Sequence, residues 1–100
     1  MSNAQQAVAD LREQLEGTAW RMPDAMDTWA FLVTEVAEVG DILLRLERPE
    51  YFRNNEKCEN LEDELGDVMV MLATLANIYN LDLDGLCYRT CNKLLAKHGG

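Results

Sequence analysis

Two pairs of acidic residues stand at helical spacing inside two apolar stretches of the chain. Glu35 and Glu38 belong to FLVTEVAEVGDILLRL, and Glu64 and Asp67 belong to NLEDELGDVMVML. Residues three apart on a helix lie within roughly 60° of one another, one turn apart. Each pair therefore presents two carboxylates on one face, and carboxylate oxygens are hard ligands that suit Mg²⁺ or Mn²⁺.

Long helices are needed to hold these pairs, and the sequence predicts an all-α protein. The chain has only two prolines, and its long stretches rich in Leu, Val, Ala and Glu favour helix over sheet. Gly17 is predicted to end the first helix and Pro49 the second, while Asp27 or Thr28 caps the second and Asp84 the fourth. We expect helices over residues 5–16, 27–48, 59–79 and 84–97.

Each of the two long helices carries an apolar stripe beside its acid pair. The two stripes are Leu32, Val36, Val39, Leu43 and Leu46, and Leu61, Leu65, Val68, Leu72, Leu75 and Tyr79. These spacings are typical of core-facing positions, and the acids lie one residue back, on a mostly apolar flank. If the helices pack antiparallel, four carboxylates converge at the edge of the core. A divalent cation would offset their repulsion, and the lack of histidine counts against iron.

The acids also have an ordinary explanation. Single Glu and Asp side chains on helices are usually solvated or form surface ion pairs of little energetic value. Two pairs on the flanks of two core stripes are much less expected by chance. Each long helix also has an interior glycine, Gly40 or Gly66, which indicates close helix approach, room for a ligand, or packing alone.

Composition limits the class of protein. The 100 residues are enough for one domain, 1–100, although Ser2-Asn3-Ala4 resembles a cloning remnant and residues 1–4 are given no function. The net charge of −9 disfavours nucleic acid as a partner, because that binding needs basic contacts to phosphate. No stretch suits a membrane span or a signal peptide. The three cysteines are interpreted as structural thiols in a reducing cytoplasm, with a zinc site disfavoured for lack of further ligands.

The two motif-bearing stretches together resemble a known enzyme family. Glu35-Val-Ala-Glu38 is followed, 26 residues after Glu38, by Glu64-Leu-Gly-Asp67 within DELGDVMVMLATLA. This arrangement resembles the MazG-like family of all-α nucleoside triphosphate pyrophosphohydrolases, over about residues 28–95. Many members have a further Glu directly before the first motif Glu. Thr34 stands there in this chain, and a threonine can hold a water but cannot act as a base.

The resemblance implies a four-helix MazG-like bundle and a reaction. Family members split a nucleoside triphosphate between its α and β phosphates, giving the monophosphate and pyrophosphate. By this resemblance Glu35, Glu38, Glu64 and Asp67 are ligands of Mg²⁺, or of Mn²⁺. Glu35 or Glu38 also orients or deprotonates the attacking water. The resemblance further implies a homo-oligomer, a dimer or a dimer of dimers, and a house-cleaning role in nucleotide metabolism. A domain this small buries little of its surface and is marginally stable alone, so association with a second copy would also stabilise it.

Basic residues on the last predicted helix are candidates for binding phosphate. Arg89 and Lys93 lie four apart with Asn92 beside them, and family members often use such residues from this region. Lys97 extends the stripe, but cations near a helix C-terminus also complement the helix dipole. Lys57 and Arg53 are weaker candidates.

Two residues are candidates for binding the base. Trp20 lies in a proline-broken connector where relatives place stacking aromatic side chains, whereas Trp29 is assigned to the core. Asn77 lies near the acid-bearing flank, where its amide would read a base edge or make a packing or capping contact.

Other functions stay open at this stage. A catalytically silent helical dimerisation or partner-binding module would show neither metal-induced stabilisation nor turnover. A metal-binding regulator would show stabilisation without pyrophosphate release. Within the enzyme class, a phosphoribosyl-ATP pyrophosphohydrolase is the alternative.

Overall fold

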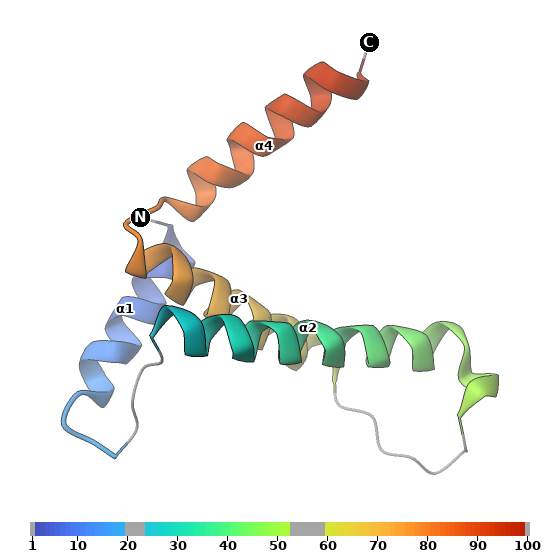
Figure 1. Ribbon diagram of the computed structural model, residues 1–100, viewed down its shortest axis with the longest axis horizontal. Helices are drawn as coiled ribbons and strands as arrows, with labels where there is room; N and C mark the ends of the chain where they lie inside the picture. Colours follow the sequence, from blue (N-terminus) through green and yellow to red (C-terminus); the bar gives the residue numbers. More distant parts are fainter. Residues whose placement is uncertain (1, 20–23, 53–59, 100) are drawn as a thin grey trace. The chain divides into compact units, whose positions relative to one another are not determined.

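The structure is a computed structural model of the 100-residue chain, and it describes residues 2–19, 24–52 and 60–99. These residues form four α-helices and one short 3-10 helix, with no strand among them (Figure 1). The elements are α1 (Asn3–Leu15), α2 (Ala25–Glu47), η1 (Pro49–Tyr51), α3 (Leu61–Ile78) and α4 (Leu83–His98). The all-α prediction is confirmed.

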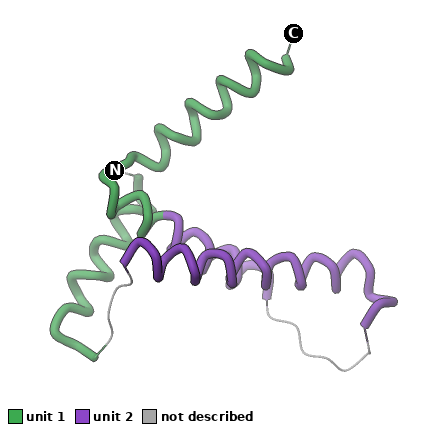
Figure 2. Tube along the Cα trace, viewed as in Figure 1, with its two compact units in different colours: residues 1–22, 73–100 green, residues 23–72 purple. Residues whose placement is uncertain are grey.

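The described chain divides into two compact units (Figure 2). One unit comprises residues 23–72 and contains α2, η1 and the first part of α3. The other comprises residues 1–22 and 73–100 and contains α1, the end of α3 and α4. All four predicted metal ligands therefore belong to the unit of residues 23–72.

The start of α2 depends on Asp24. Its carboxylate accepts a hydrogen bond of 2.8 Å from the backbone N–H of Asp27, one of the N–H groups that a helix start leaves unpaired. The prediction that Asp27 or Thr28 caps this helix is wrong, because both lie inside its first turn. The Thr28 hydroxyl donates to the Asp24 carbonyl at 2.6 Å and is fully buried.

The far end of α2 is held by Arg45. Its guanidinium pairs with Asp41 at 3.0 Å and lies 4.2 Å from the centre of the Phe52 ring. The helix ends at Glu47, and Pro49 opens η1, as the predicted stop at Pro49 requires. These contacts set the direction in which the chain leaves the helix.

The buried face of α2 differs from the predicted stripe. Val36, Leu43 and Leu46 are 53%, 44% and 62% exposed, so their assignment to the core is wrong for this chain. The buried and half-buried positions of α2 are Ala25, Thr28, Leu32, Glu35, Val39, Ile42 and Arg45. The face is rotated by about one residue because Glu35, not Val36, meets α3. Leu65 of α3 is likewise exposed, as is Tyr79, which follows α3, whereas Leu61, Val68, Leu72 and Leu75 are half-buried.

In the other unit, Gln5 joins three elements. Its side chain is 1% exposed, and its Nε2 donates to Asn77 Oδ1 at 3.0 Å and to the Leu81 carbonyl at 2.6 Å. Its Oε1 accepts from the backbone N–H of Leu83 at 2.8 Å, at the first residue of α4. The prediction that Asp84 caps this helix is therefore wrong, since the helix begins at Leu83 and Gln5 satisfies its first N–H.

The ends of α1 follow from two local features. The Ser2 hydroxyl accepts from the Gln5 N–H at 3.1 Å while Gln5 Oε1 accepts from the Ser2 N–H at 3.2 Å, a capping box. Gly17 has a φ of +84°, a backbone conformation that favours glycine and ends the helix as predicted. No helix within the described residues combines the length and apolar character that crossing a membrane requires.

The Gln5 contacts generate a stability prediction. Gln5→Leu removes the side-chain partner of Asn77 Oδ1, of the Leu81 carbonyl and of the Leu83 N–H, so we expect it to lower the free energy of unfolding by about 2–3 kcal/mol. Gln6→Leu is the matched control, because Gln6 is exposed and bonds only its helix neighbour Asp10 in a contact of 2.9 Å. It should change stability by less than about 0.5 kcal/mol. Urea unfolding followed by circular dichroism measures both, and equal effects would refute this role of Gln5.

Candidate metal centre

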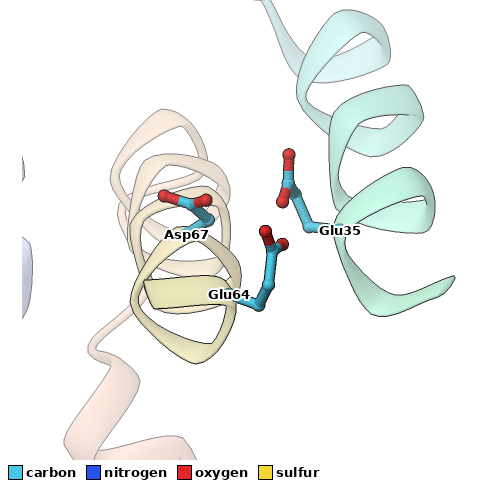
Figure 3. A group of neighbouring side chains, drawn as sticks. All are labelled: Glu35, Glu64 and Asp67. Carbon is cyan, nitrogen blue, oxygen red and sulfur yellow. The ribbon is translucent and has the colours of Figure 1, made fainter. Parts of the chain in front are cut away.

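Three of the predicted acids come together where α2 faces α3. Glu35 projects from the middle of α2, and Glu64 and Asp67 project from the first two turns of α3, so that the side chains approach one another (Figure 3). One carboxylate oxygen of each lies within 4.8 Å of the other two. Among the described residues, no other group of three or more His, Cys, Asp or Glu side chains is gathered in this way.

Burial differs sharply across the cluster. Glu64 is 1% exposed, Glu35 is half-buried and Asp67 is exposed. Within the described chain, Glu64 Oε2 is buried and has no hydrogen-bond partner. The cluster therefore has a closed inner side at Glu64 and an open outer side at Asp67, the arrangement expected of a site that a ligand enters from solvent.

A buried carboxylate of this kind needs compensation. Burying an ion costs several kcal/mol even after the protein relaxes. Glu64 lies in the first turn of α3, where the helix dipole favours negative charge by about 0.3–1 kcal/mol, and up to about 2 kcal/mol when partly buried. The dipole is thus too weak to offset the burial alone.

Repulsion within the cluster adds to this cost. Two unit charges 4–5 Å apart interact by on the order of 3–4 kcal/mol at an effective dielectric constant of about 20. Solvent around the exposed Asp67 weakens its share, whereas Glu35 and Glu64 are shielded from water. A cation between the oxygens would turn this repulsion into attraction.

The donor set fits a hard divalent cation. All three ligands offer carboxylate oxygen, which suits Mg²⁺ or Mn²⁺, and the cluster contains no imidazole or thiolate that would favour zinc or copper. The buried Oε2 of Glu64 lacks a hydrogen-bond partner, so such an ion would stabilise this atom strongly. Glu35, Glu64 and Asp67 are the residues that would hold it.

The fourth predicted ligand, Glu38, stands apart from this group. It lies one turn after Glu35 on α2 and is exposed. Its carboxylate is not among the oxygens gathered within 4.8 Å. The metal-binding and catalytic roles of Glu38 stay predictions. Thr34, which stands where relatives often have a Glu, donates its hydroxyl to the Ala30 carbonyl at 3.1 Å, within its own helix.

The two helix glycines lie in open surroundings. No atom comes within 4 Å of a Cβ built on Gly40 or on Gly66. Close approach of another part of the described chain is therefore not their reason, and the interpretation of room for a ligand stays open.

The predicted phosphate ligands belong to the other unit. Arg89, Asn92 and Lys93 all lie exposed on α4, in the unit of residues 1–22 and 73–100. Their role stays a prediction, as does that of Lys97. Lys57 and Arg53 lie outside the described residues.

The predicted base ligands have separate outcomes. Trp20 lies outside the described residues. Asn77 already uses its amide, because Oδ1 accepts from Gln5 and Nδ2 donates to the Gln5 carbonyl at 3.1 Å. It lines a small cavity of about 170 Å³ with Gln5, Asn80, Leu81 and Asp82. Trp29 is 55% exposed, and its assignment to the core is wrong for this chain.

The described residues form an all-α protein with a cluster of three carboxylates between two helices. Comparison with known families narrows the class: the model of the MazG nucleotide pyrophosphohydrolase domain matches residues 25–99. The match covers α2, α3, α4 and the whole acid cluster, and the chain belongs to this family. No curated protein and no solved structure matches the chain. Family membership assigns it to the nucleotide pyrophosphohydrolases in general.

The burial of Glu64 generates a test of the metal site. Glu64→Gln removes the buried charge, so in EDTA the variant should be more stable than the native protein, by about 1–3 kcal/mol. The native protein should gain stability on adding Mg²⁺ or Mn²⁺, because the cation binds only the folded state. The variant should gain little.

Thermal unfolding followed by circular dichroism measures both effects. Glu62→Gln is the matched control, since Glu62 lies in the same helical turn but is exposed. It should retain the metal-induced rise in Tm. A rise of equal size in Glu64→Gln would show that the cation binds elsewhere.

Proposed function

We propose that the protein is a nucleoside triphosphate pyrophosphohydrolase that depends on Mg²⁺, with Mn²⁺ able to replace it. Water and the nucleotide react so that the bond between the α phosphorus and the bridging oxygen breaks, giving the nucleoside monophosphate and pyrophosphate. The observation that carries the proposal is the buried carboxylate of Glu64 in a three-acid cluster, inside a chain of the MazG family.

The acids have distinct tasks in this proposal. Glu64 anchors the cation from the closed side, and Asp67 holds it from the solvent side. A bound divalent cation supplies positive charge for the phosphates and lowers the pKa of a coordinated water. Glu35, half-buried beside Glu64, is placed to orient or deprotonate the attacking water. Glu38 shares that role or completes the ligand set, since it lies one turn after Glu35 on α2.

Recognition of the substrate draws on other residues. The triphosphate carries more negative charge than the cation neutralises. We propose that the phosphate oxygens that keep this charge are bound by Arg89, Asn92 and Lys93. Trp20 and Asn77 are proposed to contact the base. The biological role proposed is house-cleaning of the cytoplasmic nucleotide pool.

A homo-oligomer is part of the proposal. Several large apolar side chains of α2 are exposed, including Trp29, Phe31, Val33, Val36, Leu43 and Leu46. Apolar surface on this scale is typical of a protein interface. A second copy of the chain is the proposed partner, giving a dimer or a dimer of dimers.

Activity of matched acid variants tests the enzyme proposal. Asp67→Ala and Glu38→Ala should each lower pyrophosphate release by on the order of a hundredfold or more, because losing a ligand removes several kcal/mol of transition-state stabilisation. Asp63→Ala is the control, since Asp63 is also an exposed aspartate of α3, one turn before Asp67, but lies outside the cluster. The assay follows pyrophosphate and monophosphate from a panel of nucleoside triphosphates, with Mg²⁺ or with EDTA. Full activity in Asp67→Ala, or no metal-dependent release from any nucleotide, would refute the proposed site.

Solution mass tests the oligomer. Light scattering coupled to gel filtration should give at least twice the chain mass of 11.4 kDa. Val36→Glu should shift the protein toward the monomer, because it places a charge in the proposed apolar interface. Leu11→Glu on α1 is the control, as Leu11 is exposed but lies outside α2. A native monomer would contradict this part of the proposal.

A further inference from the structure

Two thiols lie side by side on the surface of α4. Cys87 and Cys91 are both free and exposed, four residues apart on one unbroken helix. Residues four apart on a helix lie on the same face, one turn apart. The sequence-based interpretation of these cysteines as structural thiols does not account for their exposure. Neither residue has a part in the proposed hydrolysis.

Helix geometry disfavours a disulfide between them. Cβ atoms at this spacing are about 5–6 Å apart on a helix, whereas a disulfide needs about 3.5–4.5 Å. Closing the bond would require α4 to unwind, and the helix runs without interruption from Leu83 to His98. The spacing therefore favours two separate thiols over a disulfide, which argues against a redox switch.

The same spacing suits a metal that needs only two ligands. With metal–sulfur bonds of about 2.3 Å, a linear S–metal–S unit spans about 4.6 Å. Two cysteine side chains on neighbouring turns of one helix face, with Cβ atoms about 5–6 Å apart, can reach that span. Structural zinc requires four ligands. Among the described residues, the cysteines are not part of any group of three or more potential ligands. A soft, thiophilic ion that accepts two thiolates is thus the cation that the pair fits, and Cu(I) is the soft first-row ion that thiolates select.

We propose that Cys87 and Cys91 form a two-thiolate binding site for Cu(I). Binding breaks two S–H bonds and forms two Cu–S bonds, so two protons leave and the bound unit carries one net negative charge. Copper stays in the Cu(I) state throughout, and no electron is transferred. The site lies outside the acid cluster, whose hard oxygen ligands suit a different kind of ion.

The protonation of the pair makes binding depend on pH. The pKa of the Cys87 thiol is raised, chiefly by the neighbouring charge of Cys91 and the hydrogen bond between them, with smaller effects from burial and Asp84. Cys87 therefore keeps its proton to higher pH than an ordinary thiol, and the metal must displace that proton. Where binding releases two protons, a rise of one pH unit strengthens it by up to about a hundredfold, against about tenfold where it releases one.

Competition for Cu(I) tests the proposal. The full-length chain, reduced and free of oxygen, is titrated against the coloured Cu(I) complex of bathocuproine disulfonate. We expect one Cu(I) per chain for the native protein and for Cys58→Ser, the control that removes the third thiol. Cys87→Ser and Cys91→Ser should each weaken binding at least tenfold. Both serine variants should fold normally by circular dichroism, since both positions are exposed.

Three results would overturn the site. The first is failure of the native protein to take Cu(I) from the dye, and the second is equal binding by the Cys87→Ser variant. The third is a stoichiometry of one ion per two chains, which would mean that sulfurs from different copies share the metal. A pH slope near tenfold per unit would also contradict a two-thiolate site.

Discussion

The burial of one carboxylate, that of Glu64, is the constraint on which the rest of the site depends. A charged group with 1% exposure and an unpartnered oxygen cannot be stabilised by the start of α3 alone. Its neighbours Glu35 and Asp67 increase the cost instead of lowering it. Positive charge from outside the chain would supply the missing stabilisation. The donor oxygens and the burial of the cluster therefore fit a hard divalent cation.

The helices are arranged in ways that serve this constraint. Asp24 begins α2 early enough for the helix to extend well beyond Glu35 on both sides, and Arg45 secures its far end against Asp41 and Phe52. The first turn of α3 brings its dipole to the acids. This arrangement reduces the apolar packing of α2. Glu35 occupies the inner face of the helix, whereas Val36 is left exposed. A second copy of the chain is the proposed cover for that surface.

Much of this was predictable from the sequence. The spacing placed Glu64 and Asp67 on one face of a helix beside a core stripe, and Glu35 likewise, because helical periodicity is a local property that a sequence carries directly. The buried face of α2 was predicted one residue away from its true position, since apolar side chains alone do not reveal that an acid faces inward. Two caps were also missed. Asp24 lies eight residues before Leu32, where the predicted apolar stripe begins, and the N–H of Leu83 is satisfied by Gln5, 78 residues away along the chain.

The exposure of Cys87 and Cys91 could not be read from sequence either, because helical spacing alone does not say which face of α4 is covered. The same limit applies to Glu38, whose spacing from Glu35 matches that of Asp67 from Glu64. One of these two exposed acids joins the cluster and the other does not. The difference lies in how α2 is turned toward α3, which is decided by packing between helices and not within one.

The measurement that tests the central claim most directly is the location of Mn²⁺ in crystals of the protein by anomalous scattering. The account predicts a strong anomalous peak bonded to Glu64 and shared with Glu35 and Asp67. A crystal in which no ion touches Glu64, and a lysine or arginine side chain reaches its carboxylate instead, would contradict it. The buried charge would then be compensated by the protein itself, and the acid cluster would not be a metal centre.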